Sequence, residues 1–313
     1  MATQTTTNTA ATATYLNKTY YDRNLLNWAK AQLVYAAFGQ KRGIPKNNGK
    51  SVEFRKWGLF TPDASTQKLT EGVTPSSQSL SQTKVDVTVD QYGAYVEISD
   101  LLEMTAYDPI QADVSKLLGE QLGIVADNVA RDAMIADASD QFAGGAQSAA
   151  AVASTAYLTV DEIRKAVRTL KANKARKFGA GAKGHYVCIV DPYATYDLQS
   201  DSLWQDVSKY SNAEQIYDGE IGRLFGVRFV ETSEGKVDAT TNIHHSLIFG
   251  EEAYGVVDIA GSGALQLIVK PRGSAGTADP LDQRSTIGAK ITAYAVKVLN
   301  PLWIIDIQHK AHA

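Results

Sequence analysis

One uninterrupted helical pattern between residues 108 and 138 constrains the fold of this chain more than any other segment. Asp108 suits an N-cap, Pro109 suits the first helical position, and Gln111 can complete a capping box. Such a helix would be about 45 Å long, so other elements must lie across it, and we call it the spine helix. Apolar residues recur at steps of three and four, the period of one helix face: Ile110, Val114, Leu117, Leu118, Leu122, Val125, Val129 and Met134.

Charged residues recur along the other side of the spine pattern, so it does not read as a membrane span. We expect this polar side to carry Asp113, Lys116, Glu120, Asp127, Arg131 and Asp132. The whole chain of 313 residues lies at or above the size at which one hydrophobic core stops growing. Two lobes that share one sheet or helix are therefore expected.

Composition excludes several classes of function. The chain has 31 basic and 34 acidic residues and a net charge of −3, which argues against a protein whose affinity comes from neutralising phosphates. Cys188 is the single cysteine, so neither a disulfide framework nor a thiolate metal site is expected. The first 14 residues have neither the basic start nor the apolar core of a secretory signal, and we expect a chain that is cytosolic when synthesised.

A long β-hairpin is expected before the spine helix. Residues 58–83 are poor in large apolar side chains, and a structureless stretch of that length is typically functional or disordered. Alternating strand patterns flank it at 51–57 and 84–98, and the phase slips at 91–93, as at a bulge or bend. A two-stranded hairpin is marginal in water. We therefore expect its polar tip to lie on something else, with a neighbouring subunit as a reasonable candidate.

The remaining segments mix helices and strands without regular alternation, which favours an α+β fold. Helices are expected at 21–38, 159–177, 193–201 and 212–217. Strands are expected at 185–190, 223–231, 246–249, 254–259, 265–270, 285–298 and 302–308. Thr159 and Glu162 form the capping-box pattern that opens the second of these helices.

No assembled active site is apparent. A G-x-G-x-x-G match at 179–184 follows a helix and precedes a strand, the reverse of a dinucleotide-binding unit, so a flexible turn is expected. His244 and His245 are adjacent and should point apart, while His309 and His312 are expected at a frayed C-terminus. We therefore expect no catalytic residue, no metal and no cofactor, and a protein that is not an enzyme.

Two segments of the sequence instead suggest surfaces for contact with other subunits. The tip carries residues 69–75, and a glycine-rich segment at 219–232 places Gly residues beside Arg and Phe, which suits a sharply shaped tip that packs against copies of itself. The alternative is that each segment is an ordinary turn with a strand. We predict intersubunit contacts at Lys68, Leu69, Glu71, Val73, Arg223, Phe225 and Arg228.

An ordered set of segments resembles the major capsid proteins of tailed double-stranded DNA bacteriophages, closest to the N-four-type branch. No single motif carries this resemblance; the succession from about residue 20 to the last strand does. The set comprises the helix ending Phe38-Gly39-Gln40, the Ile44-Pro45-Lys46-Asn47 turn, Phe54-Arg55-Lys56-Trp57, the 69–75 tip, Tyr92-Gly93 with Ser99-Asp100, the spine helix and 226–232.

The resemblance implies a Hong Kong 97-like capsid fold of class α+β. Its parts would be an N-terminal arm at 1–50, an extended loop at 51–99 and a peripheral domain at 100–158 that contains the spine helix. An axial domain at 159–266 would point at the capsomer centre, and residues 267–313 would return to the peripheral sheet. Lys68 is the only lysine of the 58–82 tip. We expect it to be a solubilising surface charge rather than a partner in a covalent crosslink.

The function implied is a major capsid protein whose pentamers and hexamers form an icosahedral shell around phage double-stranded DNA. Its partners would be copies of itself and the portal protein, with scaffolding or decoration proteins as further candidates. It would enclose DNA without sequence-specific binding, act away from membranes, assemble in the bacterial host cytoplasm and end in the virion capsid. The alternative is an encapsulin-like nanocompartment that shares the fold and encloses an enzyme cargo.

Overall fold

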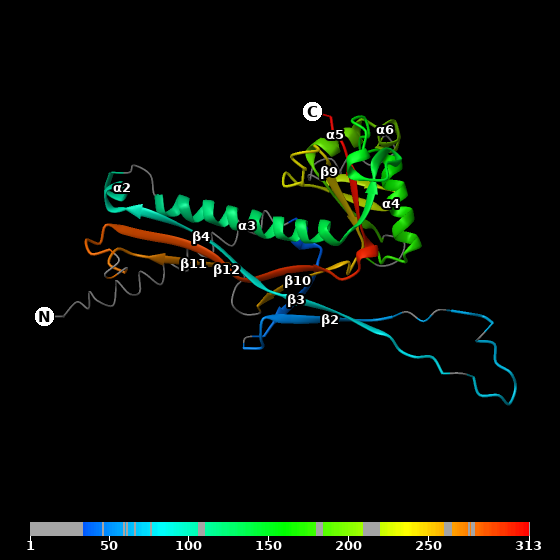
Figure 1. The fold of residues 1–313 in the computed structure, drawn as a ribbon. Helices are drawn as coiled ribbons and strands as arrows, with labels where there is room; N and C mark the ends of the chain where they lie inside the picture. The colour runs from blue at the N-terminus through cyan, green and yellow to red at the C-terminus, as the bar shows by residue number, and fades with distance from the viewer. Residues whose placement is uncertain are drawn as a thin grey trace.

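The computed structural model describes residues 34–312 except 46, 59, 61, 66, 76, 106–109, 180–183, 209–219, 260–264, 275, 277 and 278. This part of the chain forms an elongated lobe, a compact lobe and a hairpin that projects away from both (Figure 1). The first 33 residues of the expected arm at 1–50 and the expected helix at 212–217 lie outside the described residues. Most of the expected 21–38 helix does too, and its described end forms a short 3₁₀ helix, η1 (Tyr35–Ala37).

The spine helix is confirmed as α3 (Ile110–Asp137), although its expected capping residues Asp108 and Pro109 lie outside the described part. Its buried face is made of small as well as large residues, and short side chains let the helix lie close to the sheet beneath it. In the described part of the chain, no helix is both long and apolar enough to cross a membrane. The buried face consists of Ser115, Leu118, Gly119, Leu122, Gly123, Ala126, Asp127, Ala130 and Met134.

Two expectations about the faces of α3 are wrong. Leu117 is 64% exposed, because the contact face follows Gly119 and Gly123 and leaves Leu117 to one side. Asp127 is fully buried rather than on the polar side. Its Oδ1 accepts the backbone N–H groups of Val34 and Tyr35 at 3.0 and 2.8 Å, so this carboxylate holds the chain that enters the fold.

A five-stranded sheet lies beneath α3 in the elongated lobe (Figure 1). Its strands are β1 (Gln40–Ile44), β4 (Asp90–Ser99), β10 (Tyr254–Ile259), β11 (Leu265–Lys270) and β12 (Arg284–Val298). The 15-residue β12 pairs antiparallel with β4, β10 and β11, and β1 lies parallel to β10. Ile287, Ala289 and Ile291 of β12 share a core with Leu118 and Leu122 of α3. The other face of this sheet is turned away from α3.

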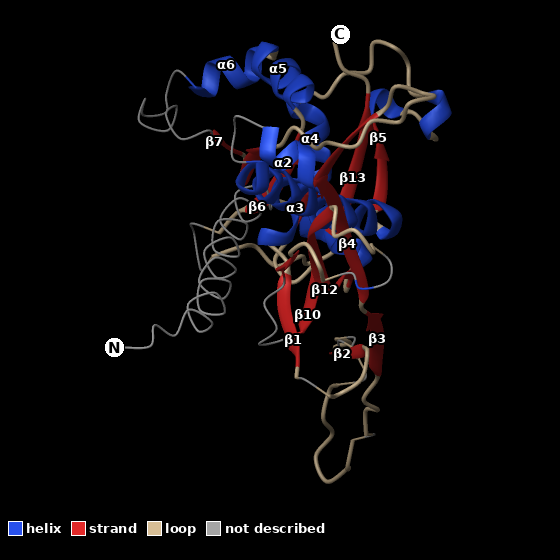
Figure 2. Ribbon diagram, turned by 90° about the vertical axis from the view of Figure 1, so that its left-hand side faces the viewer, coloured by secondary structure: helices blue, strands red, loops and turns tan. Residues whose placement is uncertain are grey.

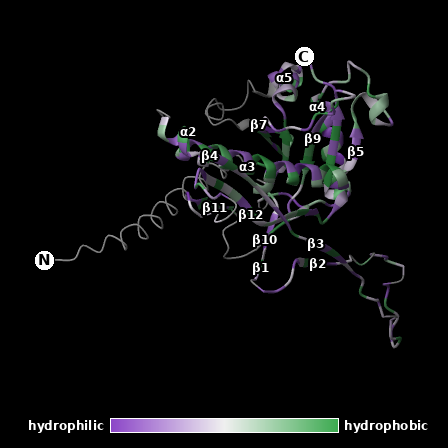
Figure 3. Cartoon of the chain, turned by 60° about the vertical axis from the view of Figure 1, so that its left-hand side comes forward, coloured by the Kyte–Doolittle hydropathy of each residue, from purple (hydrophilic) through white to green (hydrophobic). Residues whose placement is uncertain are grey.

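A six-stranded sheet forms the compact lobe, in the order β5-β13-β9-β6-β8-β7. Its strands are β5 (Ser139–Phe142), β6 (Tyr186–Val190), β7 (Glu220–Leu224), β8 (Val227–Glu231), β9 (His244–Phe249) and β13 (Ile304–His309). All residues of β6, β9 and β13 are buried, because both faces of the sheet are covered. Met134 of α3 packs against one face, and helix α4 (Val160–Ala172) packs against the other. Figure 3 shows apolar residues gathered along α3 and in this lobe.

Several shorter elements complete the described chain. Two further helices, α5 (Pro192–Ser200) and α6 (Ser202–Ser208), lie beside α4 in the compact lobe (Figure 2). A helix that the sequence pattern missed, α2 (Asp100–Thr105), joins β4 to the segment before α3. Short 3₁₀ turns occur at η2 (Ala143–Gly145), η3 (Ala149–Ala151) and η7 (Pro301–Trp303).

Two predicted elements need correction in the compact lobe. The helix expected at 159–177 ends at Ala172, because Lys174 adopts a positive φ of 53° that a helix cannot continue. The strand expected at 223–231 is two strands, β7 and β8, joined by a turn at Phe225-Gly226. The capping role of Thr159 is confirmed, since its side chain accepts the Glu162 N–H at 3.4 Å.

The expected hairpin is confirmed for its first arm and corrected for its second. β2 (Ser51–Trp57) pairs antiparallel with β3 (Gln82–Thr88), from Ser51 opposite Thr88 to Trp57 opposite Gln82. Beyond Val89 the chain leaves the hairpin, and β4 pairs with β12 instead. The irregularity expected at 91–93 is a register shift on β12 between Ile291 and Tyr294, which lie opposite Tyr92 and Asp90. One extra residue on β12 makes this a β-bulge.

The predicted domain ranges remain a prediction. Two strands that these ranges assign to one lobe pair with strands of the other. β10 lies within the range expected for the axial domain, 159–266, yet it pairs with β12 in the elongated lobe. β13 lies within 267–313, yet it belongs to the sheet of the compact lobe. The chain therefore crosses between the lobes at β10 and again at β13.

Candidate assembly surfaces

The root of the hairpin is packed firmly on the body of the molecule. Val52 and Phe54 of β2 lie against buried apolar residues of β1, β3, β10 and β12. The Phe54 ring sits directly over Gly255: a Cβ at that position would lie 2.7 Å from the ring. Since such a contact is too close for a real side chain, Gly255 is what lets the ring dock there. The root thus fixes the direction in which the hairpin leaves the body.

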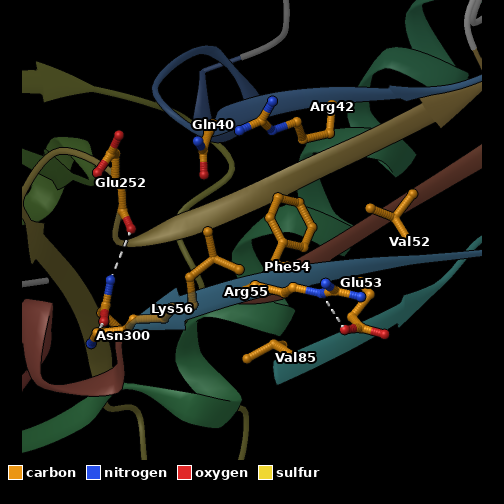
Figure 4. A pocket seen from close by; sticks show the side chains of 11 residues that line it. Gln40, Arg42, Val52, Glu53, Phe54, Arg55, Lys56, Val85, Glu252 and Asn300 are labelled. Atoms are coloured by element: carbon orange, nitrogen blue, oxygen red, sulfur yellow. Dashed lines mark hydrogen bonds and ion pairs between the residues drawn. The ribbon is translucent and has the colours of Figure 1, made fainter. Parts of the chain in front are cut away.

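A pocket of about 580 Å³ opens beside this root, between β1, β2 and the start of β10 (Figure 4). Four of its charged side chains, those of Glu53, Arg55, Lys56 and Glu252, have partners within the described chain. Arg55 Nε donates to Glu53 at 2.7 Å, and Lys56 Nζ donates to the side-chain oxygen of Asn300. Asn300 in turn donates to the Glu252 carbonyl at 3.2 Å. These bonds hold the root further in place.

The same lysine also holds the root against the compact lobe. Lys56 Nζ lies 5.5 Å from the centre of the Trp303 ring, within cation–π range. Trp57 and Trp303 both line a neighbouring pocket of about 690 Å³, together with Leu302, Lys174 and Arg176. Arg176 is paired with Glu252 at 3.0 Å. The hairpin root is therefore positioned by contacts to both lobes.

The tip of the hairpin, by contrast, has no body of its own to pack on. The Gly58 N–H donates to the Ser81 carbonyl at 2.8 Å, and beyond that bond the described residues form no regular strand. A turn closes between Thr70 and Val73, where the Val73 N–H donates to Thr70 O at 3.1 Å and Gly72 takes a φ of 77°. The predicted contact residues Lys68, Leu69, Glu71 and Val73 all surround this turn.

Those tip residues are exposed, including the apolar ones. Leu69 is 71% exposed and Val73 is 63% exposed, and Phe60 and Leu80 are exposed as well. Burying a side chain of this size stabilises a protein by roughly 1.5–3 kcal/mol. The tip forgoes that stabilisation within one subunit, and it would recover part of it against a second molecule.

The second predicted contact set lies on the β7–β8 hairpin of the compact lobe. Phe225 and Gly226 take φ values of 49° and 79°, so they form a two-residue turn of the type that twists with its strands. A positive φ is unusual for an aromatic residue, and the Phe225 ring is held beneath the Arg164 guanidinium, 5.3 Å from its centre. Arg223 and Arg228 lie directly opposite each other across the two strands. This places two guanidinium groups on one face next to the turn.

The structure does not bring the two predicted sets together. The tip lies at the far end of the projecting hairpin, whereas β7 lies in the compact lobe (Figures 1 and 2). They are two separate surfaces of one subunit. In the shell that the sequence resemblance implies, a subunit would have neighbours on several sides, and separate contact surfaces would be the expected arrangement.

The sequence analysis missed a third exposed apolar surface, on α2. Leu101, Leu102 and Met104 are exposed there, and this helix buries none of its residues. The Leu102 N–H donates to the Ser99 hydroxyl at 3.3 Å, and Arg272 is bonded to Glu103. The dipeptide Ser99-Asp100 before two leucines was the available indication, since Ser and Asp are common at helix starts.

The buried His244 and His245 each bind a carboxylate of the same chain. His244 Nδ1 lies 2.5 Å from Asp191 Oδ2, and His245 Nδ1 lies 2.7 Å from Asp306 Oδ2. The adjacent rings thus bind different carboxylates, as expected for neighbours on a strand. Burial raises the pKa of Asp191, but the hydrogen bond and the charge of His244 outweigh it, so this pKa lies below its ordinary value. Among the described residues, no group of three or more His, Cys, Asp or Glu side chains is placed to hold a metal ion.

The expectation of a frayed C-terminus is wrong. His309 ends β13 fully buried, with Nε2 2.9 Å from the Ser246 hydroxyl, and burial lowers its pKa to about 4. His312 Nδ1 lies 2.6 Å from Asp197 Oδ1, and its ring stacks on Tyr157 at 3.7 Å. These bonds fasten the end of the described chain to α5. Strand pairing by β13 supplied the tertiary contacts that a local pattern could not reveal.

The glycine-rich match at 179–184 is a link between α4 and β6, as expected from its order in the chain. Phe178 and His185 bridge across it, with backbone hydrogen bonds of 2.8 and 3.1 Å in the two directions. Residues 180–183 lie outside the described part. Since the segment precedes a strand rather than a helix, it lacks the helix N-terminus that would hold a phosphate.

Comparison with known proteins adds a family match and many structural matches. The model of the family described as phage capsid protein matches residues 123–251, from the middle of α3 to just beyond β9. No curated protein sequence matches this one significantly. The sequence match thus spans the second half of the spine helix and most of the compact lobe.

Solved capsid structures match the fold over nearly the whole chain. The capsid of Ralstonia phage GP4 matches with a TM-score of 0.67 and 14% identity, covering 90% of this chain and 89% of that one. The capsid of cyanophage P-SCSP1u gives 0.64 and 16%, covering 90% and 89%. A structure from Mycobacterium phage Che8 gives 0.63 and 17%, covering 88% and 90%. At these identities the likeness shows a shared fold.

Proposed function

We infer that this chain, a phage capsid protein by its family match and by a fold that confirms the predicted α+β, Hong Kong 97-like architecture, is the major capsid protein of a tailed bacteriophage. The observation that carries this conclusion is the fold match to phage capsids across about nine tenths of the chain. The chain is accordingly a structural component of a virion that assembles into a multimeric shell.

The proposed shell consists of pentamers and hexamers that close into an icosahedron around the phage double-stranded DNA. Each subunit contributes the hairpin tip, the β7–β8 turn and α2 as separate exposed surfaces. Contacts that are individually modest become stable when each subunit engages several neighbours at once. In this proposal Lys68, Leu69, Glu71 and Val73 lie over an adjacent subunit, and Arg223, Phe225 and Arg228 help line the capsomer.

The domain assignment belongs to the same proposal. Residues 1–50 would form the N-terminal arm, 51–99 the extended loop, 100–158 the peripheral domain, 159–266 the axial domain and 267–313 the return to the peripheral sheet. The firm root and unsupported tip of the hairpin support the assignment of an extended loop. The compact lobe around α4 supports the axial assignment.

Further partners and the place of assembly are also part of the proposal. We expect a portal protein at one vertex, with scaffolding or decoration proteins as candidates, and assembly in the host cytoplasm away from membranes. The net charge of −3 suits a shell that confines DNA without gripping it in a sequence-specific way. A structural role without catalysis fits the buried histidine–carboxylate pairs, which bind each other rather than a substrate.

An encapsulin-like shell was the alternative, and none of the matches described above supports it. Electron microscopy of particles purified from phage-infected cells tests the proposed function. Closed shells that are built mainly of this chain and contain double-stranded DNA are expected. Shells filled with an enzyme would favour the alternative, and a chain that remains monomeric or dimeric in such a lysate would contradict both.

A further inference from the structure

A cleft runs along the root of the projecting hairpin, where β2 meets the compact lobe. It consists of the two pockets described above, of about 580 and 690 Å³, whose walls share Lys56, Glu252 and Asn300. Figure 4 shows the first of them from close by. Pockets of this size accommodate small ligands or single side chains rather than whole domains. We call this feature the root cleft.

The walls of the root cleft are held in place by bonds within the chain. The Trp303 indole N–H donates to the Asn173 carbonyl at 3.2 Å, and the Asn173 side chain donates to the Leu302 carbonyl at 3.1 Å. The Gly250 N–H donates to the Trp303 carbonyl at 3.1 Å. These bonds join the end of α4, the end of β9 and η7 into one frame. Because this frame is preformed, binding costs little conformational entropy on the side of the site.

One part of the root cleft offers exposed aromatic and aliphatic surface. Trp57, at the end of β2, is 59% exposed, and Leu302, in η7, is 60% exposed. Pro301 and the half-buried Trp303 line the same pocket. Tryptophan is enriched at protein interfaces, where such rings often anchor a partner. This surface therefore suits a large apolar side chain of a ligand.

The acidic side chains of the root cleft are already engaged in two ion pairs. Glu53 is paired with Arg55 at 2.7 Å, and Glu252 is paired with Arg176 at 3.0 Å. Among the described residues that line the cleft, there is no further Asp or Glu. The lining therefore holds no carboxylate for its remaining cations.

Those remaining cations make the root cleft basic. Across the described chain, Arg42, Lys56 and Lys174 have no carboxylate within ion-pair distance. Lys56 is bonded to the Asn300 side-chain oxygen and lies over the Trp303 ring, neither of which neutralises its charge. Arg42 and Lys174 are exposed. The cleft is therefore positive although the whole chain has a net charge of −3, and it is complementary to an acidic ligand.

An acidic peptide with one large apolar side chain matches both features of the cleft. Its carboxylates can pair with Arg42 in one pocket and with Lys174 in the other, while its apolar side chain packs on Trp57 and Leu302. Single-stranded nucleic acid matches less well. The carboxylates of the cleft repel phosphates, and its Leu and Pro side chains give a base no aromatic ring on which to stack.

We propose that the root cleft binds an acidic segment of a partner protein. An aromatic or leucine side chain of that segment lies against Trp57 and Leu302, and its carboxylates pair with Arg42 and Lys174. Because Trp57 belongs to the hairpin and Leu302 to the compact lobe, the bound segment bridges the two and fixes the direction of the hairpin. The site lies within one subunit, so this inference goes beyond the proposed function and does not depend on shell assembly.

A model peptide tests the chemistry of the site. The probe is fluorescein-labelled Asp-Glu-Phe-Glu-Asp-amide, and its fluorescence anisotropy is measured with unassembled full-length chain. It should bind about tenfold more tightly than the same peptide with Gly in place of Phe, and salt should weaken its binding. Absence of binding, or equal binding of the Phe and Gly peptides, would overturn the proposal. An oligothymidylate that binds more tightly than the peptide would assign the cleft to nucleic acid and overturn it as well.

Two substitutions test whether the peptide lies in the root cleft. Lys174→Glu and Trp57→Ala should each weaken binding by about tenfold, and neither should alter unfolding, because both side chains are exposed. The matched controls are Lys270→Glu and Tyr95→Ala, which change an exposed lysine and an exposed aromatic residue of the elongated lobe. Both controls should bind like the unmodified chain. Equal affinities of all four variants would show that the peptide binds elsewhere and overturn the proposal.

A second copy of this chain is the remaining candidate occupant of the cleft. Sedimentation velocity of the unmodified chain and of Trp57→Ala distinguishes it from a partner protein. The two should sediment alike. A dimer of the unmodified chain that dissociates in Trp57→Ala would make the cleft a contact between copies and overturn the proposal. A chain that binds the peptide in the cleft but never forms particles would instead overturn the proposed function alone.

Discussion

The spine helix and the hairpin tip are opposite solutions to the placement of apolar side chains. In α3, Leu118, Leu122 and Met134 are buried against the two sheets of the same chain. In the tip, Leu69 and Val73 remain mostly exposed although the hairpin root is firmly packed. The first region holds one subunit together, and in the proposed shell the second would gain its burial from another subunit.

This difference separates residues that set the free energy of unfolding of one subunit from residues that would set the stability of the assembly. Replacements in α3 should change the free energy of unfolding of a single subunit. Replacements in the tip should leave that quantity unchanged and alter assembly. The predictions that follow test this separation.

The largest effect is expected for Leu118→Asp. It places a carboxylate in the core between α3 and β12, so the free energy of unfolding should fall by about 2–5 kcal/mol or the subunit should not fold. Urea unfolding of unassembled subunits measures this. Leu117→Asp is the matched control on the next, exposed residue, and it should change stability by less than about 0.5 kcal/mol. Equal losses from both variants would refute the assignment of the buried face.

A pH-dependent effect is expected at Asp127, which joins α3 to the entering chain. Burial raises its pKa to about 6, although hydrogen bonds from the backbone N–H groups of residues 34–36 act to lower it. Because the folded pKa exceeds the unfolded one, this group's contribution to stability is full below about pH 4 and is lost as the pH rises through about 6. The loss amounts to about 3 kcal/mol in total.

Asp127→Asn removes this titration while keeping an oxygen that can accept the Val34 and Tyr35 N–H groups. The stability of the variant relative to the unmodified chain should therefore rise between pH 4 and pH 7 and then level off. Urea unfolding at several pH values provides the measurement. A constant difference across that range would show that Asp127 does not titrate as its burial requires.

A smaller effect is expected at the hairpin root. Gly255→Ala would press a methyl group into the Phe54 ring, so we expect a loss of about 1–3 kcal/mol from overpacking. The additional change Phe54→Leu should restore part of it by making room. Thermal unfolding of the single and double variants distinguishes them, and additive losses would argue against a direct contact between the two residues.

The smallest effect on the isolated subunit is expected in the tip. Leu69→Ser with Val73→Ser should change the free energy of unfolding by less than about 0.5 kcal/mol, because both side chains are exposed. The same variant should assemble poorly, as measured by the fraction of chain that sediments as particles. Normal assembly would remove the tip from the list of contact surfaces, and a destabilised subunit would show that the tip packs within its own chain.

Periodicity predicted the elements whose partners are local or regular. The extent of α3, the bounds of β2, β10 and β11, and the capping by Thr159 could all be read from spacing and side-chain type. The division between β3 and β4 was missed because the strand pattern at 84–98, with its phase slip at 91–93, was interpreted as one bent strand, whereas the two strands pair with different partners.

Long-range contacts account for what the pattern missed. Asp127 is buried because backbone donors from residues 34 and 35 reach it, and His309 is ordered because β13 pairs with β9. Neither partner is close in sequence. The candidate contact residues of the tip were identifiable because an apolar-poor segment of that length stands out, whereas the exposed leucines of α2 form too short a pattern to recognise.

Hydrogen exchange in free subunits and in assembled particles tests the central claim most directly. The described amides of residues 58–82 should exchange rapidly in free subunits and at least tenfold more slowly in particles, while those in the middle of α3 should exchange slowly in both. Equal protection of the tip in the two states would contradict its role as an intersubunit element.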